Sequence, residues 1–153
     1  MRIIQKNMSS QPSRAKPYVR EMRPPDLAAV AAIQAASPEG SQWPAEDYLI
    51  YRGLVAAAQE HILGFVVWRD LGSREAEILN LAVDPLERRR GIARMLVESV
   101  LSKHLDEVFL EVRESNAHAQ TFYLALGFQT VGRRPEYYKN PAEAAIVMVF
   151  HSC

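Results

Sequence analysis

The sequence predicts an α/β (α+β) domain in which helices cover both faces of a mixed central sheet of about six to seven strands. The chain has 153 residues, 48% of them hydrophobic and 24% charged, which is the size and balance of one globular domain. Short segments with the two-residue period of strands alternate with segments of helical period, and no repeat or Gly/Ser-rich linker separates them. We expect the order β-α-α-β-β-β-α-β-α-β-β, with residues 18–153 in one domain and residues 1–17 as a flexible N-terminal arm.

The first half of the chain should supply four strands and two helices. Pro24, Pro25 and Asp26 favour a helix start, because proline and acidic residues suit the first helical turn. The expected elements are a strand at residues 18–22, a helix up to about residue 36, a short helix after Pro44, a hairpin at residues 54–58 and 62–68, and a strand at residues 76–83.

Regular alternation in the strand at residues 76–83 predicts two distinct faces. One face should hold Leu79, Leu81 and Val83, and the other Ile78, Asn80 and Ala82.

In the second half, Ile92, Leu96 and Val100 recur every four residues, which predicts a helix packed on the sheet. Ser115 is expected to cap the next helix, and Gly127 should follow its end in a left-handed conformation. The expected strands of this half lie at residues 108–112, 128–131 and 145–150.

Composition excludes several classes of function. Eighteen basic residues balance eighteen acidic ones, so nucleic-acid binding as the main function is disfavoured. Cys153 is the only cysteine, which rules out an intramolecular disulfide and favours a reducing compartment, and four scattered histidines offer no metal-ligand spacing. No apolar run is long enough to span a membrane. We therefore expect a cytoplasmic protein without a metal, as a monomer or weak dimer.

The segment from residue 83 to residue 93 is the most informative stretch. A strand leads through Pro85 into a loop with three arginines and Gly91, and a helix begins at once. The first N–H groups of a helix have no intrahelical partner and bind phosphate readily. The alternatives are a solvated basic turn or a nucleic-acid patch. The loop lacks the Gly-Lys-Ser/Thr of a Walker A motif and the three glycines of a dinucleotide-binding fingerprint.

The pattern Arg88-x-x-Gly91-x-Ala93 resembles the pyrophosphate-binding loop of the GNAT N-acetyltransferases, with Ala93 in place of the commoner second glycine. The resemblance runs from about residue 18 to residue 150, and it implies the GNAT fold and acetyl-CoA as the cofactor. It also implies two sets of cofactor contacts. They are the diphosphate loop of Arg88, Arg89, Arg90, Gly91, Ile92, Ala93 and Arg94, and the strand backbone of Leu81, Ala82 and Val83 along the pantetheine arm.

Glu111 is a carboxylate in an apolar strand, on the face opposite Leu110 and Val112. Such a group needs an ionic partner, for example Arg113, or a wet cleft. The pattern Leu110-Glu111-Val112-Arg113-x-x-Asn116, followed by Tyr123-x-x-Leu126-Gly127-Phe128, resembles the RimI-like GNAT subgroup that acetylates the N-terminal alanine of a ribosomal protein. That resemblance implies Glu111 as general base, Tyr123 as general acid next to the cofactor, and Asn116 as a cofactor contact. Glu77 is the alternative base.

The residue types fit direct attack of an amine on a thioester, because no Ser/His/Asp or Cys/His arrangement suggests a covalent intermediate. An α-amine with a pKa of ~8 costs about 1–1.5 kcal/mol to deprotonate at pH 7, against about 4.6 for a lysine. The expected acceptor is thus a peptide or protein N-terminus, such as that of a ribosomal protein. Trp43, Tyr137 and Tyr138 are expected to line its binding site, although Trp43 also suits the core and the tyrosines an exposed loop.

Three other functions stay open at this point. They are acetylation of a small amine, coenzyme A binding without catalysis, and nucleic-acid binding through the arginine-rich loop.

Overall fold

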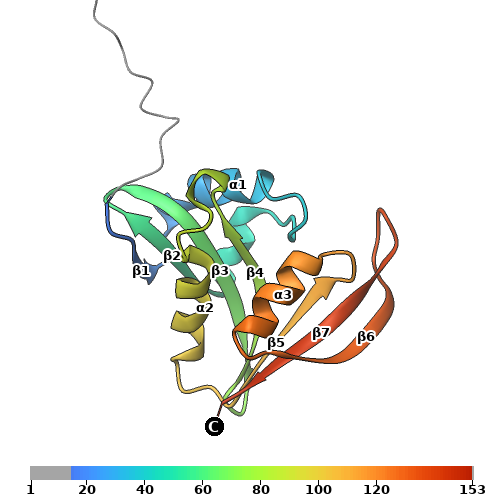
Figure 1. The fold of residues 1–153 in the computed structure, drawn as a ribbon. Helices are drawn as coiled ribbons and strands as arrows, with labels where there is room; N and C mark the ends of the chain where they lie inside the picture. The colour runs from blue at the N-terminus through green and yellow to red at the C-terminus, as the bar shows by residue number, and fades with distance from the viewer. Residues whose placement is uncertain (1–14, 153) are drawn as a thin grey trace, which may run out of the picture.

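In the computed structural model, which describes residues 15–152, seven strands form one mixed sheet in the order β1-β2-β3-β4-β5-β7-β6 (Figure 1). Only β4 and β5 pair in parallel, and every other neighbouring pair is antiparallel. The strands are β1 (Tyr18–Glu21), β2 (Arg52–Ala58), β3 (His61–Gly72), β4 (Glu75–Val83), β5 (Glu107–Arg113), β6 (Gln129–Tyr138) and β7 (Glu143–His151).

Helices cover both faces of the sheet. On one face, Val30 and Ile33 of α1 pack with Phe65 and Val67 of β3. The other face carries α2 and α3, which lie in front of the strands in Figure 1. The helices are α1 (Leu27–Ala35), α2 (Ile92–Leu101) and α3 (Ala117–Ala125), and the short 3₁₀ segments are η2 (Pro24–Asp26), η3 (Ala45–Ile50) and η4 (Pro85–Glu87). This arrangement confirms the predicted fold class and element order, with the helix expected after Pro44 formed as 3₁₀.

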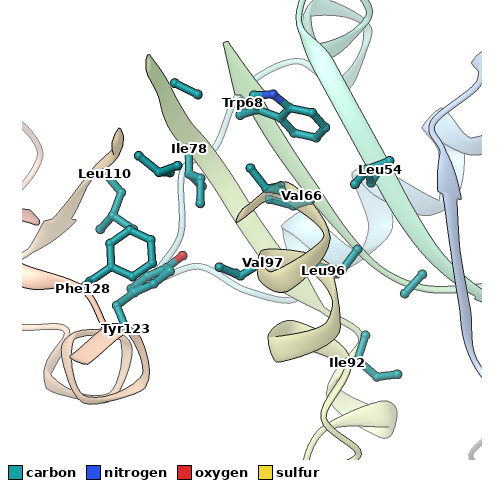
Figure 2. Close-up of a cluster of buried hydrophobic side chains, with 14 of the residues drawn as sticks. Leu54, Val66, Trp68, Ile78, Ile92, Leu96, Val97, Leu110, Tyr123 and Phe128 are labelled. Carbon is teal, nitrogen blue, oxygen red and sulfur yellow. The ribbon is translucent and has the colours of Figure 1, made fainter. Parts of the chain in front are cut away.

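Figure 2 shows the larger core cluster, in which α2 and α3 pack on the sheet. Ile92, Leu96 and Val100 are all buried, as the four-residue spacing predicts. Burying each such side chain contributes roughly 1.5–3 kcal/mol. The same cluster holds Tyr123 of α3 and Phe128, so the helix that precedes β6 is anchored by aromatic packing.

The sheet opens between β4 and β5. Their pairing runs from Glu75 opposite Glu107 to Ile78 opposite Leu110 and stops there, so residues 79–83 have no partner in β5. At this point β4 carries a bulge, because Val67 and Trp68 of β3 face Asn80 and Ile78 and leave Leu79 as the extra residue. A bulge bends its strand and increases the local twist, which separates β4 from its parallel neighbour.

The bulge makes the predicted alternation of β4 wrong. Ile78 packs on the same side as Leu81 and Val83, whereas Leu79 packs with Ala82 on the side of α1. One extra residue exchanges the two faces of every position beyond it, because side chains alternate with a period of two.

Two local predictions are also wrong. Asn116, not Ser115, caps α3, since its side-chain oxygen accepts from the N–H of Ala119 at 3.1 Å. Tyr137 and Tyr138 end β6 rather than lying in a loop. The predicted conformation of Gly127 is confirmed, with φ of 102°.

Most of the expected N-terminal arm, and Cys153, lie outside the described residues. Within residues 15–152, no helix has the length and apolar character needed to cross a membrane.

Candidate active site

The opening between β4 and β5 continues into a cavity of about 480 Å³. Its walls come from segments far apart in the sequence: β4, β5, the start of α3, the end of β6 and the loop before η3. The lining residues of predicted function are Trp43, Leu81, Glu111, Asn116, Tyr123 and Tyr138. The structure thus brings the proposed acid and base to one cavity.

Tyr123 reaches this cavity from the core. Its ring packs edge-on against Phe122 and Phe128, with centroids 5.0 and 5.2 Å away, and only 6% of the residue is exposed. Its hydroxyl has no hydrogen-bond partner among residues 15–152, and Figure 2 shows it directed away from Phe128. Burial raises the pKa of Tyr123, because the charged form is poorly solvated there. Tyr123 is therefore protonated at neutral pH and can donate that proton.

Glu111 lies across the cavity on β5, with 15% of its side chain exposed. Its Oε1 is 3.2 Å from Nε of Arg134, which reaches over from β6. Hydrogen bonding to Glu111 raises the pKa of Tyr137, since an ionised phenol beside a carboxylate is unfavourable. Arg113 instead pairs with Glu143 at 3.3 Å. The ionic partner of Glu111 is thus Arg134 and not Arg113, which the sequence offered as one possible partner.

The three aromatic residues predicted at the acceptor site differ in exposure. Trp43 is 38% exposed and its ring lies 6.2 Å from that of Tyr51, so the alternative of a core tryptophan is wrong. Tyr137 is 48% exposed. Tyr138 is half-buried, with the guanidinium of Arg113 4.3 Å from its ring centre and its hydroxyl donating to the Glu111 carbonyl at 3.3 Å. Burial, with the Glu111 charge in second place, raises the pKa of Tyr138 to about 12.

Glu77, the alternative base, lies on β4 near the cavity but does not line it. It pairs with Arg69 of β3 at 2.9 Å, and 23% of its side chain is exposed.

The loop that leads into α2 has the backbone of an anion-binding turn. Gly91 precedes the helix in a left-handed conformation, with φ of 74°, and Arg89 is left-handed as well, with φ of 65°. The first amides of α2 thereby face outward without intrahelical partners. Gly91 and Arg94 border a separate shallow groove and not the main cavity.

The arginines of this loop differ in how firmly their side chains are held by ion pairs. Arg90 is tied down by Glu87 at 2.5 Å and by the carbonyl of Ala15 at 3.3 Å. Arg94 pairs with Glu98 at 2.7 Å, and Arg88 lies 3.8 Å from Glu39, a weak contact. Arg89 makes no ion pair with any residue of the part that the structure describes.

The other predicted cofactor contacts differ in whether their side chains line the cavity. The side chain of Ile92 is buried in the core, and Ala82 packs towards α1, so neither side chain borders the cavity. Leu81 does line it, and its N–H donates to Oδ1 of Asn80 at 3.0 Å. Asn116 uses its oxygen as the helix cap, and its NH₂ group has no partner within residues 15–152.

Two neighbours of the cavity were not predicted as site residues, Asn80 and Arg134. Asn80 gave a signal in the sequence, as the one polar residue in the apolar run from Ile78 to Val83. Arg134 stands in the segment Arg133-Arg134-x-x-Tyr137-Tyr138, which resembles the RimI-like subgroup, but its contact with Glu111 spans two strands and depends on long-range register.

The chain is similar to several known proteins. The [ribosomal protein bS18]-alanine N-acetyltransferase of Haemophilus ducreyi is 32% identical over 108 residues, which cover 66% of this chain and 74% of that protein. The crystal structure of the ribosomal-protein-S18-alanine N-acetyltransferase from Escherichia coli has a TM-score of 0.77 and 26% identity, covering 89% of this chain and 94% of that one. Ard1 from Thermoplasma volcanium has a TM-score of 0.81 and 30% identity, covering 90% and 98%.

These likenesses agree with the resemblance seen in the loop and in the Glu111–Tyr123 segment. The family model for acetyltransferases matches residues 18–128, which is well over half of the sequence. The chain belongs to the acetyltransferase (GNAT) family.

Proposed function

We propose that this protein transfers an acetyl group from acetyl-CoA to the α-amino group of a protein N-terminus, with Glu111 as general base and Tyr123 as general acid. The observation that carries the proposal is the unpaired stretch between β4 and β5, because it leaves one cavity with the carboxylate and the phenol on its walls. The relatives named for alanine N-acetylation favour this acceptor class.

The proposed reaction is a direct displacement. The acceptor nitrogen forms a bond to the thioester carbonyl carbon, and the carbon–sulfur bond breaks. Glu111 takes the proton from the acceptor amine, through a water if the two do not touch. Tyr123 gives its proton to the departing thiolate, for which its protonated state at neutral pH is suited. A main-chain N–H on β4 near Ala82 or Val83 is the proposed donor to the developing oxyanion.

Acetyl-CoA would bind along the edge of β4 that β5 leaves free. Residues 79–83 offer main-chain groups to the pantetheine arm, and Leu81 borders the cavity. The left-handed turn at Gly91 leaves the first amides of α2 for the diphosphate. Arg88 and Arg89 are free to add charge, since neither is held in a short ion pair as Arg90 is. The unpaired edge of β4 and the outward amides of α2 support this placement of the cofactor.

The acceptor would enter beside Trp43 and Tyr138, which line the cavity, and beside Tyr137, whose hydroxyl interacts with Glu111. An α-amine suits a single carboxylate base, because its ordinary pKa of ~8 lies about 2 units below that of lysine. A ribosomal protein is the proposed partner, and the cytoplasm the proposed site of action.

The test is a set of steady-state rates with acetyl-CoA. The acceptors are an Ala-starting peptide, the same peptide with a blocked N-terminus, and a panel of polyamines, amino acids and aminoglycosides. We expect turnover of the free peptide alone. Turnover restricted to the small amines would replace the proposal with small-molecule acetylation, and acetyl-CoA binding without any turnover would indicate a binding module.

A further inference from the structure

The loop before η3 forms the cavity wall opposite β5. Its residues 38–43 all line the cavity, yet they belong to no helix or strand. A loop of this kind needs fixed contacts if it is to hold a defined shape. Trp43, proposed to contact the acceptor, is its last residue.

Three buried polar side chains hold this wall. Gln34 of α1, Tyr48 of η3 and Asn80 of β4 are 7%, 1% and 6% exposed. Tyr48 donates its hydroxyl hydrogen to Oε1 of Gln34, and Asn80 donates to the Tyr48 oxygen at 2.9 Å. Burial raises the pKa of Tyr48, so its hydroxyl stays a donor. The three side chains therefore form one connected network, here called the Asn80 network.

The network reaches the wall by two routes. Gln34 donates from Nε2 to the carbonyl of Trp43 at 2.5 Å, and Asn80 donates to the carbonyl of Ser41 at 3.1 Å. Ser41 returns a bond to β4, from its hydroxyl to the carbonyl of Leu79 at 3.3 Å. Leu79 is the bulge residue, so the wall is fixed at the position where β4 and β5 separate.

Asn80 links the wall to the strand proposed to hold the cofactor. Its Oδ1 accepts from the N–H of Leu81, while its NH₂ group serves Tyr48 and Ser41. Both ends of one short side chain are thus committed, one to each side of the cavity. Buried networks of this kind have few alternative arrangements, because an unpaired polar atom would be costly.

We infer that Asn80 is a positioning residue for the acceptor: through Gln34 and Tyr48 it sets the distance of the 38–43 wall from β4. Without it, the carbonyl of Ser41 loses its hydrogen bond to β4, while Trp43 keeps its bond from Gln34 and its ring contacts with Tyr48 and Tyr51. The acceptor site then widens, whereas α2 and its amides keep their packing. This inference rests on the proposed function, because it assumes that the acceptor is a protein N-terminus.

The test compares Asn80→Ala with the wild type in two readouts, the peptide KM and the amide hydrogen exchange of residues 38–43, with kcat and the acetyl-CoA Kd as controls. We expect the KM for the Ala-starting peptide to rise about tenfold, as expected for one lost hydrogen-bonded tie. The kcat should stay within about threefold, because Glu111 and Tyr123 are not touched. The acetyl-CoA Kd should rise less than the peptide KM, because the N–H of Leu81 loses its Asn80 partner while the α2 turn keeps its amides. Independently of activity, amide hydrogen exchange in residues 38–43 should accelerate while that of α2 does not.

A second variant guards against misfolding of the first. Tyr48→Phe removes only the hydroxyl and keeps the ring on Phe65, whose centroid lies 5.7 Å away, so it should fold and shift both readouts in the same direction. Val100→Ala is the matched control, a truncation in the core of α2 that destabilises without touching the wall. It should leave the peptide KM and the exchange of residues 38–43 unchanged.

Unchanged exchange in residues 38–43 for both network variants would overturn the inference. So would an equal rise of the peptide KM and the acetyl-CoA Kd, which would indicate general distortion. If the wild type fails to acetylate the peptide, the proposed function is wrong, and accelerated exchange would still support the positioning of the wall.

Discussion

Two carboxylates, Glu111 and Glu77, lie on neighbouring strands, each beside an arginine. Glu111 pairs with Arg134 at 3.2 Å and lines the cavity, whereas Glu77 pairs with Arg69 at 2.9 Å and does not. Only a carboxylate within reach of the acceptor amine, directly or through one water, can act as its base. The geometry therefore favours Glu111.

We expect Glu111→Gln to lower kcat by about 100-fold or more, the usual contribution of a general base. Glu77→Gln is the matched control, with the same chemical change one strand away, and should alter kcat by less than about threefold. Calorimetry should give the same acetyl-CoA Kd for both variants and the wild type. A larger loss of kcat from Glu77→Gln than from Glu111→Gln would indicate that Glu77, and not Glu111, is the general base.

The two parts of the Tyr123 side chain have different roles. Its ring is packed in the core and contributes to stability, whereas its hydroxyl has no partner among residues 15–152 and is proposed to act in catalysis. Tyr123→Phe should lower kcat by about 100-fold. The free energy of unfolding should change by less than about 1 kcal/mol, since no hydrogen bond is lost. Chemical denaturation and steady-state kinetics on the same preparation measure both. A stable variant with full activity would exclude Tyr123 as the acid.

At the scale of elements, the turn into α2 depends on the backbone of Gly91. Its φ of 74° is left-handed, and no atom lies within 4 Å of where a Cβ would stand. Gly91→Ala should therefore cost about 1–2 kcal/mol through the dihedral angle alone. We expect weaker acetyl-CoA binding as well, because relaxation of the turn would move the first amides of α2.

Gly91→Asn is the matched control, since asparagine adopts left-handed conformations more readily than alanine. It should retain more stability and more affinity than Gly91→Ala in thermal unfolding and calorimetry. Equal acetyl-CoA affinity in all three proteins would show that this turn does not hold the diphosphate.

The junction of β1 with η2 rests on an ion pair between Arg20 and Asp26, 2.8 Å apart, with 7% of the Asp26 side chain exposed. The hydrogen bond from Arg20 is the main reason that the pKa of Asp26 lies below its ordinary value of 3.8. A lowered carboxyl pKa contributes stability above the unfolded pKa, and this contribution is lost as the pH falls through the folded pKa.

Asp26→Asn should thus cost about 2 kcal/mol at pH 7, the order expected for charge-assisted hydrogen bonds. The difference from the wild type should shrink as the pH falls below 3.8, where the wild-type carboxylate becomes protonated. Asp70→Asn, which removes the exposed pair with Arg52, should cost less than about 1 kcal/mol at any pH. Urea unfolding between pH 7 and about pH 2.5 measures both, and a constant Asp26→Asn difference would contradict the linkage.

The elements that the sequence predicted well carry strong local signals. The spacing of Ile92, Leu96 and Val100 and the glycine at position 127 are read from a few neighbouring residues. The bulge at Leu79 is different, because it is visible only in the pairing of β4 with β3. The choice of Asn116 over Ser115 as the cap is similar, since both residue types suit that position.

On the scale of the whole molecule, the sheet consists of two parts joined only by the parallel pairing of four residues in β4 with four in β5. The first part, β1 to β4, is covered by α1 and α2, and the second, β5 to β7, carries α3 (Figure 1). The cavity lies where the two parts diverge, so the proposed acid, the proposed base and both proposed binding walls meet where the β4–β5 pairing ends.

This arrangement explains which parts of the site could be predicted. Glu111, Asn116 and Tyr123 lie close in sequence and were recognisable as one motif. The Asn80 network and the Arg134 contact join residues between 14 and 46 positions apart, and the register that brings them together is set by the whole sheet. That register cannot be predicted from the residue pattern of any one short segment.

A crystal structure with a conjugate of coenzyme A and an Ala-starting peptide would test the central claim most directly. The account predicts that the junction of the conjugate lies just beyond Ile78 and Leu110, the last residues that pair β4 with β5, with Glu111 and Tyr123 on its two sides. The diphosphate should contact the amides that follow Gly91, and the peptide should leave past Trp43 and Tyr138. A conjugate bound elsewhere, or a junction out of reach of both Glu111 and Tyr123, would contradict it.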